Sequence, residues 1–176
     1  MSDNKKSGKY TKENMITPPD PCNHDRVKNG WKKVISPTID RFGIDVSELT
    51  IIDVGSSNGR KSLQKYVADK NNKNIWEAPG EYGLVPSNMS AIEGDPAVLD
   101  DLRKNVPGLT VFHHDFSSAG LTSLNIQKRY HVALLCEVLE HLYPGEDQMR
   151  LLRDTAELVA PGGGMHVTFP RQTHID

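Results

Sequence analysis

Cysteine and long apolar runs are both scarce in this chain of 176 residues. Its two cysteines, Cys22 and Cys136, are too few and too far apart for a disulfide scaffold or a cysteine-based zinc site. No run approaches the ~18 apolar residues of a membrane span, and the N-terminus lacks the apolar core of a signal peptide. The formal charge of −2 gives no general reason to expect nucleic-acid binding. We therefore expect a soluble, cytoplasmic protein without membrane contact, with Cys136 as a buried reduced thiol.

The composition divides the chain into three parts. Residues 1–23 are rich in Lys and Asn, poor in aliphatic residues and end in a proline cluster, which predicts a disordered tail. Residues 24–48 form an N-terminal helical segment, because apolar residues recur there at helical spacing, and Pro37 is expected to break or kink it. Residues 49–176 form one core domain.

Short apolar runs alternate with helical periods through this core. We expect strands at 49–55, 90–95, 109–115, 131–137 and 164–169. We expect helices at 59–70, after Asp95-Pro96, and at 146–160. The last helix should bury one face, formed by Met149, Leu152, Ala156 and Val159. It should end at Pro161-Gly162-Gly163-Gly164. The alternation predicts a doubly wound, Rossmann-like α/β fold: a parallel sheet of five strands in three α/β/α layers. Residues 71–89 fit neither period and are expected to be a long, functional loop.

Acidic residues follow four of the expected strands. They are Asp53 after the first strand, Glu93 and Asp95 after the second, Asp115 after the third, and Glu137 with Glu140 after the fourth. Open α/β sheets bind ligands beyond the carboxyl ends of their strands. Acids at successive strand ends therefore indicate a ligand rich in hydroxyls, amines or positive charge. Each acid also has a structural interpretation, such as a helix cap for Asp95 or a turn with Ser117 and Ser118 for Asp115.

The segment Gly55-Ser56-Ser57-Asn58-Gly59, called the glycine turn below, follows the first acid. Glycine lets the backbone pass close to a bound molecule because it has no Cβ and tolerates positive φ. Neither a P-loop pattern nor G-x-G-x-x-G is present. The preceding acid also disfavours a phosphate, so an ammonium group or a hydrogen-bond network is the better ligand for this turn.

The stretch D-V-G-S-S-N-G resembles the first motif, D-x-G-x-x-x-G, of class I S-adenosylmethionine (SAM) dependent methyltransferases. The resemblance extends over roughly residues 49–170. LLCEVLEHL is similar to the segment of the E-V-L-E-H group that follows the fourth strand, and LRDTAELVAPGGGMHVTFP looks like that group's next helix, Pro-Gly-Gly turn and fifth strand.

The resemblance implies a set of residues that contact the cofactor: Asp53, Gly55, Ser56, Gly59, Glu93, Gly94, Asp115, Phe116 and Glu137. Asp53 and the two turn glycines would shape the pocket for the methionine part. Glu93 would accept both ribose hydroxyls, and Asp115 would accept from the adenine amino group beside the amide of Phe116. The segment beginning at Glu137 would lie beneath the methionine part.

The implied reaction is methyl transfer from SAM to a small-molecule or RNA acceptor, with S-adenosylhomocysteine as the product. A general base is needed only where the acceptor is a hydroxyl or is protonated. By their position, Glu137 and His141 are the candidates for this base. No catalytic residue is assigned. The absence of an Asn/Asp-Pro-Pro-Tyr motif disfavours adenine or glutamine N-methylation. Acceptor contacts are expected from the 71–89 loop and the N-terminal helix.

Three alternatives remain. Glu137, Glu140 and His141 would share one helical turn and resemble the metal-binding motif of small-RNA 3′-terminal 2′-O-methyltransferases; metal-free relatives share E-V-L-E-H, so no metal is expected. An NAD-dependent oxidoreductase is less favoured, because no Tyr-x-x-x-Lys pair stands at the expected place. Finally, the resembling family has two further strands, so a truncated or partner-dependent SAM-binding domain is an alternative. A partner, a dimer or the N-terminal helix would then cover the edge of the fifth strand.

Overall fold

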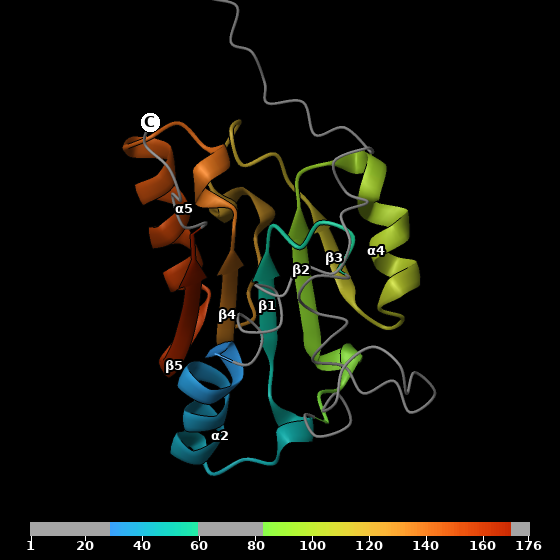
Figure 1. The fold of residues 1–176 in the computed structure, drawn as a ribbon, viewed down its shortest axis with the longest axis vertical. Coiled ribbons are helices and arrows are strands. Elements are labelled where there is room, and N and C mark those ends of the chain that lie inside the picture. Colours follow the sequence, from blue (N-terminus) through green and yellow to red (C-terminus); the bar gives the residue numbers. More distant parts are fainter. Residues whose placement is uncertain (1–28, 60–82, 170–176) are drawn as a thin grey trace, which may run out of the picture.

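The computed structural model describes residues 29–59 and 83–169, and its centre is a single parallel sheet (Figure 1). The strands stand in the order β3-β2-β1-β4-β5. Their bounds are β1 Ile51–Val54, β2 Met89–Glu93, β3 Thr110–His113, β4 Tyr130–Cys136 and β5 Val159–Thr168. Every paired neighbour runs parallel. The five-stranded Rossmann-like sheet expected from the sequence is therefore confirmed.

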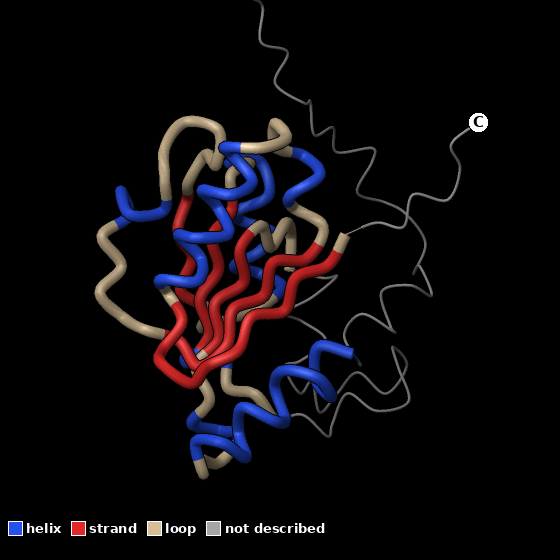
Figure 2. Tube along the Cα trace, turned by 90° about the vertical axis from the view of Figure 1, so that its left-hand side faces the viewer, coloured by secondary structure: helices blue, strands red, loops and turns tan. Residues whose placement is uncertain are grey.

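Helices cover both faces of this sheet (Figure 2). They are α2 (Ser36–Phe42), α4 (Leu99–Asn105) and α5 (Glu146–Glu157). Shorter turns are η2 (Trp31–Ile35), η3 (Val46–Glu48), η5 (Pro86–Asn88), η6 (Pro96–Val98), η7 (Leu121–Leu124) and η8 (Leu139–His141). The arrangement gives the three layers of a doubly wound domain.

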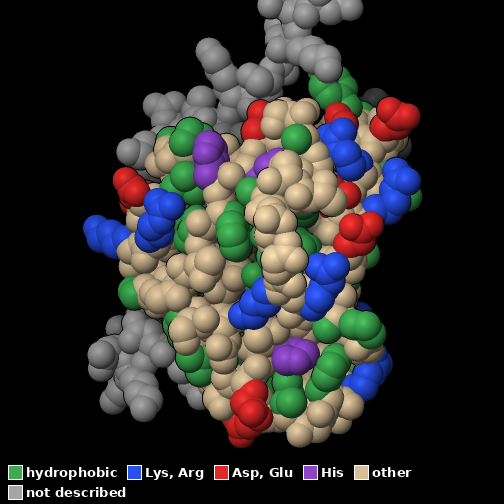
Figure 3. All heavy atoms as spheres, turned by 180° about the vertical axis from the view of Figure 1, so that it is seen from behind, with side chains coloured by type: hydrophobic (Ala, Val, Ile, Leu, Met, Phe, Trp, Pro, Cys, Tyr) green, Lys and Arg blue, Asp and Glu red, His purple; other side chains and the backbone are tan. Residues whose placement is uncertain are grey.

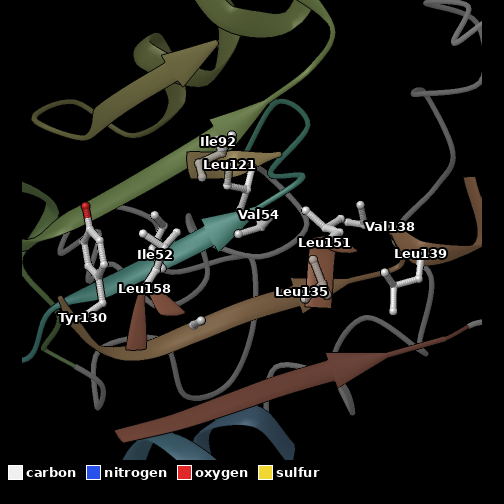
Figure 4. Packing of buried hydrophobic residues seen from close by; sticks show 11 residues of the cluster. Ile52, Val54, Ile92, Leu121, Tyr130, Leu135, Val138, Leu139, Leu151 and Leu158 are labelled. Carbon is white, nitrogen blue, oxygen red and sulfur yellow. The ribbon is translucent and has the colours of Figure 1, made fainter. Parts of the chain in front are cut away.

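Two apolar cores lie on opposite sides of the sheet. Ile51 packs with Ile35 of the N-terminal helix and Leu102 of α4. Its neighbour Ile52 packs instead with Leu151 of α5 and with Leu158 at the C-cap of that helix (Figure 4). Successive side chains of a strand point to opposite faces, so adjacent isoleucines of β1 can anchor both helical layers.

The N-terminal helix continues through Pro37 instead of stopping there. Residues Trp31–Ile35 form a π turn, and the amide of Ser36 donates to the carbonyl of Trp31 five residues back. Pro37 has no amide hydrogen to donate and stands in the first turn of α2, a position where none is needed. The expected break is therefore absent, and the π turn is the local irregularity before the proline.

Helix α5 is shorter than expected, and its buried face is different. It ends at Glu157, and its buried residues are Leu151 and Thr155, followed by Leu158 at the C-cap. Of the predicted face, Leu152 and Val159 are half-buried against the same core as Leu151, whereas Met149 is 51% exposed and Ala156 is also exposed. The packing of Leu151 and Leu158 against the β1 and β4 core sets the rotation of the helix. Thr155 Oγ1 is buried there with no hydrogen-bond partner among the described residues.

The expected stop signal after α5 lies inside β5, which starts at Val159. Tyr130 pairs with Val159, and Val132 pairs with Gly164. Between these two pairs the chain advances by two residues in β4 but by five residues in β5. Pro161, Gly162 and Gly163 belong to this excess and form a bulge, not the end of a helix. Arg41 of α2 donates to the carbonyl of Gly162 at 2.8 Å.

Several other expectations can be compared with the described residues. His113 is exposed and His114 is buried, as alternation along the strand predicted, whereas Cys136 is only half-buried. The tail 1–23, the helix 59–70 except for its first residue, and most of the 71–89 loop lie outside the described residues. Within the described ranges, no helix has the length and apolar character needed to cross a membrane. On the face shown in Figure 3, Lys and Arg side chains are interspersed with Asp and Glu side chains.

Candidate functional site

The glycine turn leaves β1 at the carboxyl end of the sheet and is fixed to the neighbouring strands. Gly55 has φ +78°, and its amide donates to the carbonyl of Ile92 in β2 at 2.8 Å. A Cβ on Gly55 would overlap Cγ2 of Val138, which follows β4. The first turn glycine is therefore required twice, by its backbone conformation and by the close approach of Val138.

The rest of the turn is equally constrained. Ser56 is buried, and its hydroxyl donates to the carbonyl of Asp53 at 3.0 Å. Ser57 has φ +51°, an uncommon conformation for a residue with a side chain. Gly59 has φ +74° and meets Leu102 and Val106 of the α4 region, where a Cβ would lie 2.8 Å from Leu102 Cδ1. Packing thus holds the turn at both of its glycines.

Glu93 ends β2 and joins two loops of the site. It is 8% exposed. Its Oε2 accepts the amide hydrogen of Ser57 at 2.6 Å, and its Oε1 accepts that of Asp95 at 2.8 Å. Each carboxylate oxygen has a second lone-pair site, so both can accept one further donor. The pair of amides fixes the orientation of the carboxylate and leaves capacity for a ligand with two hydroxyls.

The residues after Glu93 confirm one structural interpretation from the sequence. Asp95 caps the turn Pro96–Val98 by accepting the amide of Ala97 at 2.9 Å. Gly94 lies against the third strand, where a Cβ would be 3.1 Å from the carbonyl oxygen of His114. Gly94 therefore allows the second and third strand ends to approach closely.

Asp115 is exposed and forms the turn that its sequence context also predicted. Its Oδ1 accepts from the hydroxyl of Ser117 at 2.7 Å and from the amide of Ser117 at 2.9 Å. These two hydrogen bonds, the hydroxyl first, lower the pKa of Asp115 below its ordinary value. Its Oδ2 has no hydrogen bond from the described residues, so the ionised carboxylate retains one oxygen for a donor.

Phe116 is half-buried beside Asp115. Its ring packs edge-on to His114 with 6.0 Å between centroids. Arg150 of α5 donates to its carbonyl at 3.1 Å and forms an ion pair with Asp147 at 3.0 Å. Helix α5 therefore helps to fix the loop that follows β3.

Glu137 follows β4 and has φ +57°. Its amide donates to the carbonyl of Thr168 at 3.1 Å, and its Oε1 accepts from the Thr168 hydroxyl at 3.2 Å. Because a left-handed residue interrupts the chain here, Glu137 does not belong to the short turn Leu139–His141. The premise that Glu137, Glu140 and His141 share one helical turn was wrong. In the described ranges, no group of three His, Cys, Asp or Glu side chains is placed to hold a metal ion.

Sequence reasoning identified acids at four strand ends but not the contacts between them. It missed the amide of Ser57, which ties the glycine turn to Glu93, and the hydroxyl of Thr168, which bonds Glu137. It also missed Val138, which requires Gly55. No local signal marks these contacts, because each joins residues far apart in the chain.

Comparison with known proteins shows the fold. No protein-family model matches the sequence, and no curated protein matches it. Among solved structures, Streptomyces venezuelae DesVI gives a TM-score of 0.58 at 17% identity, over 88% of this chain and 54% of DesVI. This chain therefore shares its Rossmann-like fold with DesVI.

Two further structures of similar fold are named as methyltransferases. A TehB-like SAM-dependent methyltransferase from Corynebacterium glutamicum gives a TM-score of 0.50 at 13% identity, over 89% of this chain and 78% of the other. The sugar N-methyltransferase KedS8 from Streptoalloteichus gives 0.52 at 13% identity, over 87% and 56%. This chain thus spans about half the length of DesVI and KedS8. At these identities the similarity is one of fold.

Proposed function

We propose that this chain binds SAM and transfers its methyl group to a small-molecule or RNA acceptor. The observation that carries the proposal is the hydrogen bond of 2.6 Å between the Ser57 amide and Glu93. It joins the D-x-G-x-x-x-G turn after β1 to the acid after β2, two motif elements separated by 36 residues. A nucleoside cofactor would span these two elements in a sheet of this order.

The residues fit such a cofactor at its three parts. Asp53, Gly55, Ser56 and Gly59 would line the methionine part, together with Glu137. The two oxygens of Glu93 would accept the two ribose hydroxyls, with Gly94 allowing close approach. Asp115 would accept from the adenine amino group through Oδ2, and the amide of Phe116 would meet a ring nitrogen.

The bound cofactor would supply an electrophilic methyl group on a sulfonium. The protein then needs chiefly to hold a nucleophile in line with the methyl carbon and to exclude water. Where the acceptor is a hydroxyl or a protonated amine, a base must remove a proton, and Glu137 or His141 are placed after β4 for that role.

The charge of the chain and two exposed aromatic side chains bear on the choice of acceptor. The net charge of −2 and the mixed charges of the face in Figure 3 favour a small molecule over RNA. Tyr143 and Phe169, which are 56% and 59% exposed, follow β4 and β5 and offer apolar contact. Acceptor contact by the N-terminal helix stays a prediction; Val34 and Phe42 of this helix lie beside Gly164 and Gly162 of β5.

A partner-dependent SAM-binding domain is a second candidate, and one observation favours it. Within the described residues β5 pairs only with β4, so its other edge is unpaired. An unpaired edge strand is a template for pairing with another chain. A partner or a second copy of this chain would then complete the sheet, and activity would depend on it.

The test is calorimetric titration of the purified chain with S-adenosylhomocysteine. We expect a low-micromolar dissociation constant, about −8 kcal/mol. Glu93→Gln keeps the size of the side chain but replaces one acceptor oxygen with a donor, and should weaken binding by about tenfold or more. Glu157→Gln, an exposed change at the end of α5, is the matched control and should bind as the wild type does. A folded wild-type chain that binds no cofactor would overturn the proposal.

A further inference from the structure

Thr168, the last residue of β5, makes two hydrogen bonds with Glu137, which follows the neighbouring strand β4. Its carbonyl accepts the amide of Glu137, and its hydroxyl donates to Oε1 of Glu137. Thr168 stands opposite Cys136, the last residue of β4, at the end of five consecutive pairs from Gly164 to Thr168. The register of β5 therefore determines where this hydroxyl lies.

Glu137 needs such support because its backbone is in the left-handed region, with φ +57°. That conformation is unfavourable for a residue with a Cβ and persists where surrounding contacts impose it. Strained residues of this kind cluster at ligand sites. The two contacts from Thr168 hold both the backbone and the carboxylate of Glu137.

The position of Glu137 relative to the glycine turn follows from its neighbours. β4 lies beside β1, with Leu134 opposite Asp53. Val138, the next residue after Glu137, packs so closely on Gly55 that a Cβ there would overlap it. Glu137 thus lies between the glycine turn and the end of β5, at the place proposed for the methionine part.

We infer that Thr168 is a positioning residue, whose hydroxyl holds the Glu137 carboxylate as the counter-charge for the ammonium group of the cofactor. The inference rests on the proposed function. Charge-assisted hydrogen bonds are stronger than neutral ones, and an oriented carboxylate binds an ammonium better than a rotating one. Thr168 therefore acts on the ligand through Glu137, and Thr168 itself need not contact the ligand.

The test compares two ligands on a set of variants by calorimetric titration. S-adenosylhomocysteine carries the ammonium group, whereas 5′-methylthioadenosine has the same nucleoside and thioether but lacks the amino-acid end. We expect Thr168→Val to weaken S-adenosylhomocysteine binding by about fivefold and Glu137→Gln by about tenfold. Binding of 5′-methylthioadenosine should change by less than about twofold in both variants.

The coupling between the residues is measured with the double variant. Because Thr168 acts through Glu137, the double variant should lose about tenfold, as Glu137→Gln does alone, and not about fiftyfold. Thr168→Ser keeps the hydroxyl and should restore most of the affinity. Thr110→Val, at the opposite end of the sheet in β3, is the matched control and should bind as the wild type does.

The results that would contradict the inference differ from those that would contradict the proposed function. Equal weakening of both ligands by Thr168→Val, with a lowered thermal midpoint, would show a purely structural residue and overturn the inference. Unchanged affinity for S-adenosylhomocysteine, additive losses, or no rescue by serine would overturn it as well. In these cases wild-type binding and the Glu93→Gln effect would leave the proposed function standing. A wild-type chain that binds neither ligand would overturn both.

Discussion

The two ends of the sheet handle buried polar groups differently. At the end where the strands begin, side chains bond to other parts of the sheet: the Tyr130 hydroxyl of β4 donates to Ser90 of β2 at 2.8 Å, and His131 Nδ1 accepts the amide of Thr50, just before β1, at 3.1 Å. At the carboxyl end, the carboxylates of Glu93 and Glu137 are held by donors, and each oxygen of Glu93 keeps a second lone-pair site. At the first end, these internal hydrogen bonds stabilise the fold. The other end is oriented but still able to accept donors from a ligand.

The largest effect should come from filling the tight contact at the carboxyl end. Gly55→Ala adds a Cβ that overlaps Val138 and must also adopt a positive φ. We expect a loss of roughly 2–4 kcal/mol in the free energy of unfolding, measured with urea. Gly43→Ala is the matched control, because Gly43 has φ +62° but open space around it, and should cost only about 1 kcal/mol. Equal losses would show that Val138 does not determine the residue at 55.

A smaller effect is expected where the strands begin. Tyr130→Phe leaves the buried Ser90 hydroxyl without its donor and should lower the free energy of unfolding by about 1–2 kcal/mol. Burial also raises the pKa of Tyr130, so it remains protonated and able to donate. Affinity for S-adenosylhomocysteine should not change, because this pair lies away from the site. Weakened binding in a stably folded variant would contradict the separation of the two ends.

The smallest effect should come from pH. Burial, with a minor contribution from Lys128, lowers the pKa of His131 below its ordinary value of 6.5. The unfolded chain then binds the proton more readily, so this contribution to stability is complete above pH 6.5 and is lost as the pH falls toward the folded pKa. His131→Gln should reduce the pH dependence of urea unfolding between about pH 7.5 and pH 5.5. An unchanged pH dependence would exclude His131 as its source.

The sheet could be predicted from the sequence because its signals are local. Apolar runs of strand length, each followed by turn residues, located all five strands. Because the strands are parallel, their carboxyl ends lie at the same end of the sheet, and this predicted that Asp53, Glu93 and Glu137 lie there. The rotation of α5 was predicted only in part, because Met149 and Leu152 fit a helical period as well as Leu151 and Thr155 do. Only the position of the sheet core decides between these two faces.

Tertiary contacts account for the other differences. Pro161 and the following glycines have the composition of a stop signal, yet pairing with β4 carries the strand through them. The left-handed conformation of Glu137 has no sequence signal, because glutamate is not a residue typical of that region. Its support comes from Thr168, 31 residues away, and such a pairing is not encoded in any local pattern.

The bulge in β5 makes the strand two independently aligned pieces. Val159 is aligned by Tyr130, while Gly164 to Thr168 are aligned by their own five pairs with β4. A shift of one residue in an ordinary strand reverses the direction of every side chain beyond it. Here the surplus residues can absorb a change in length before it reaches Thr168. The bulge therefore allows insertions and deletions where α2 packs without moving the carboxyl end of the sheet, where we propose that the ligand binds.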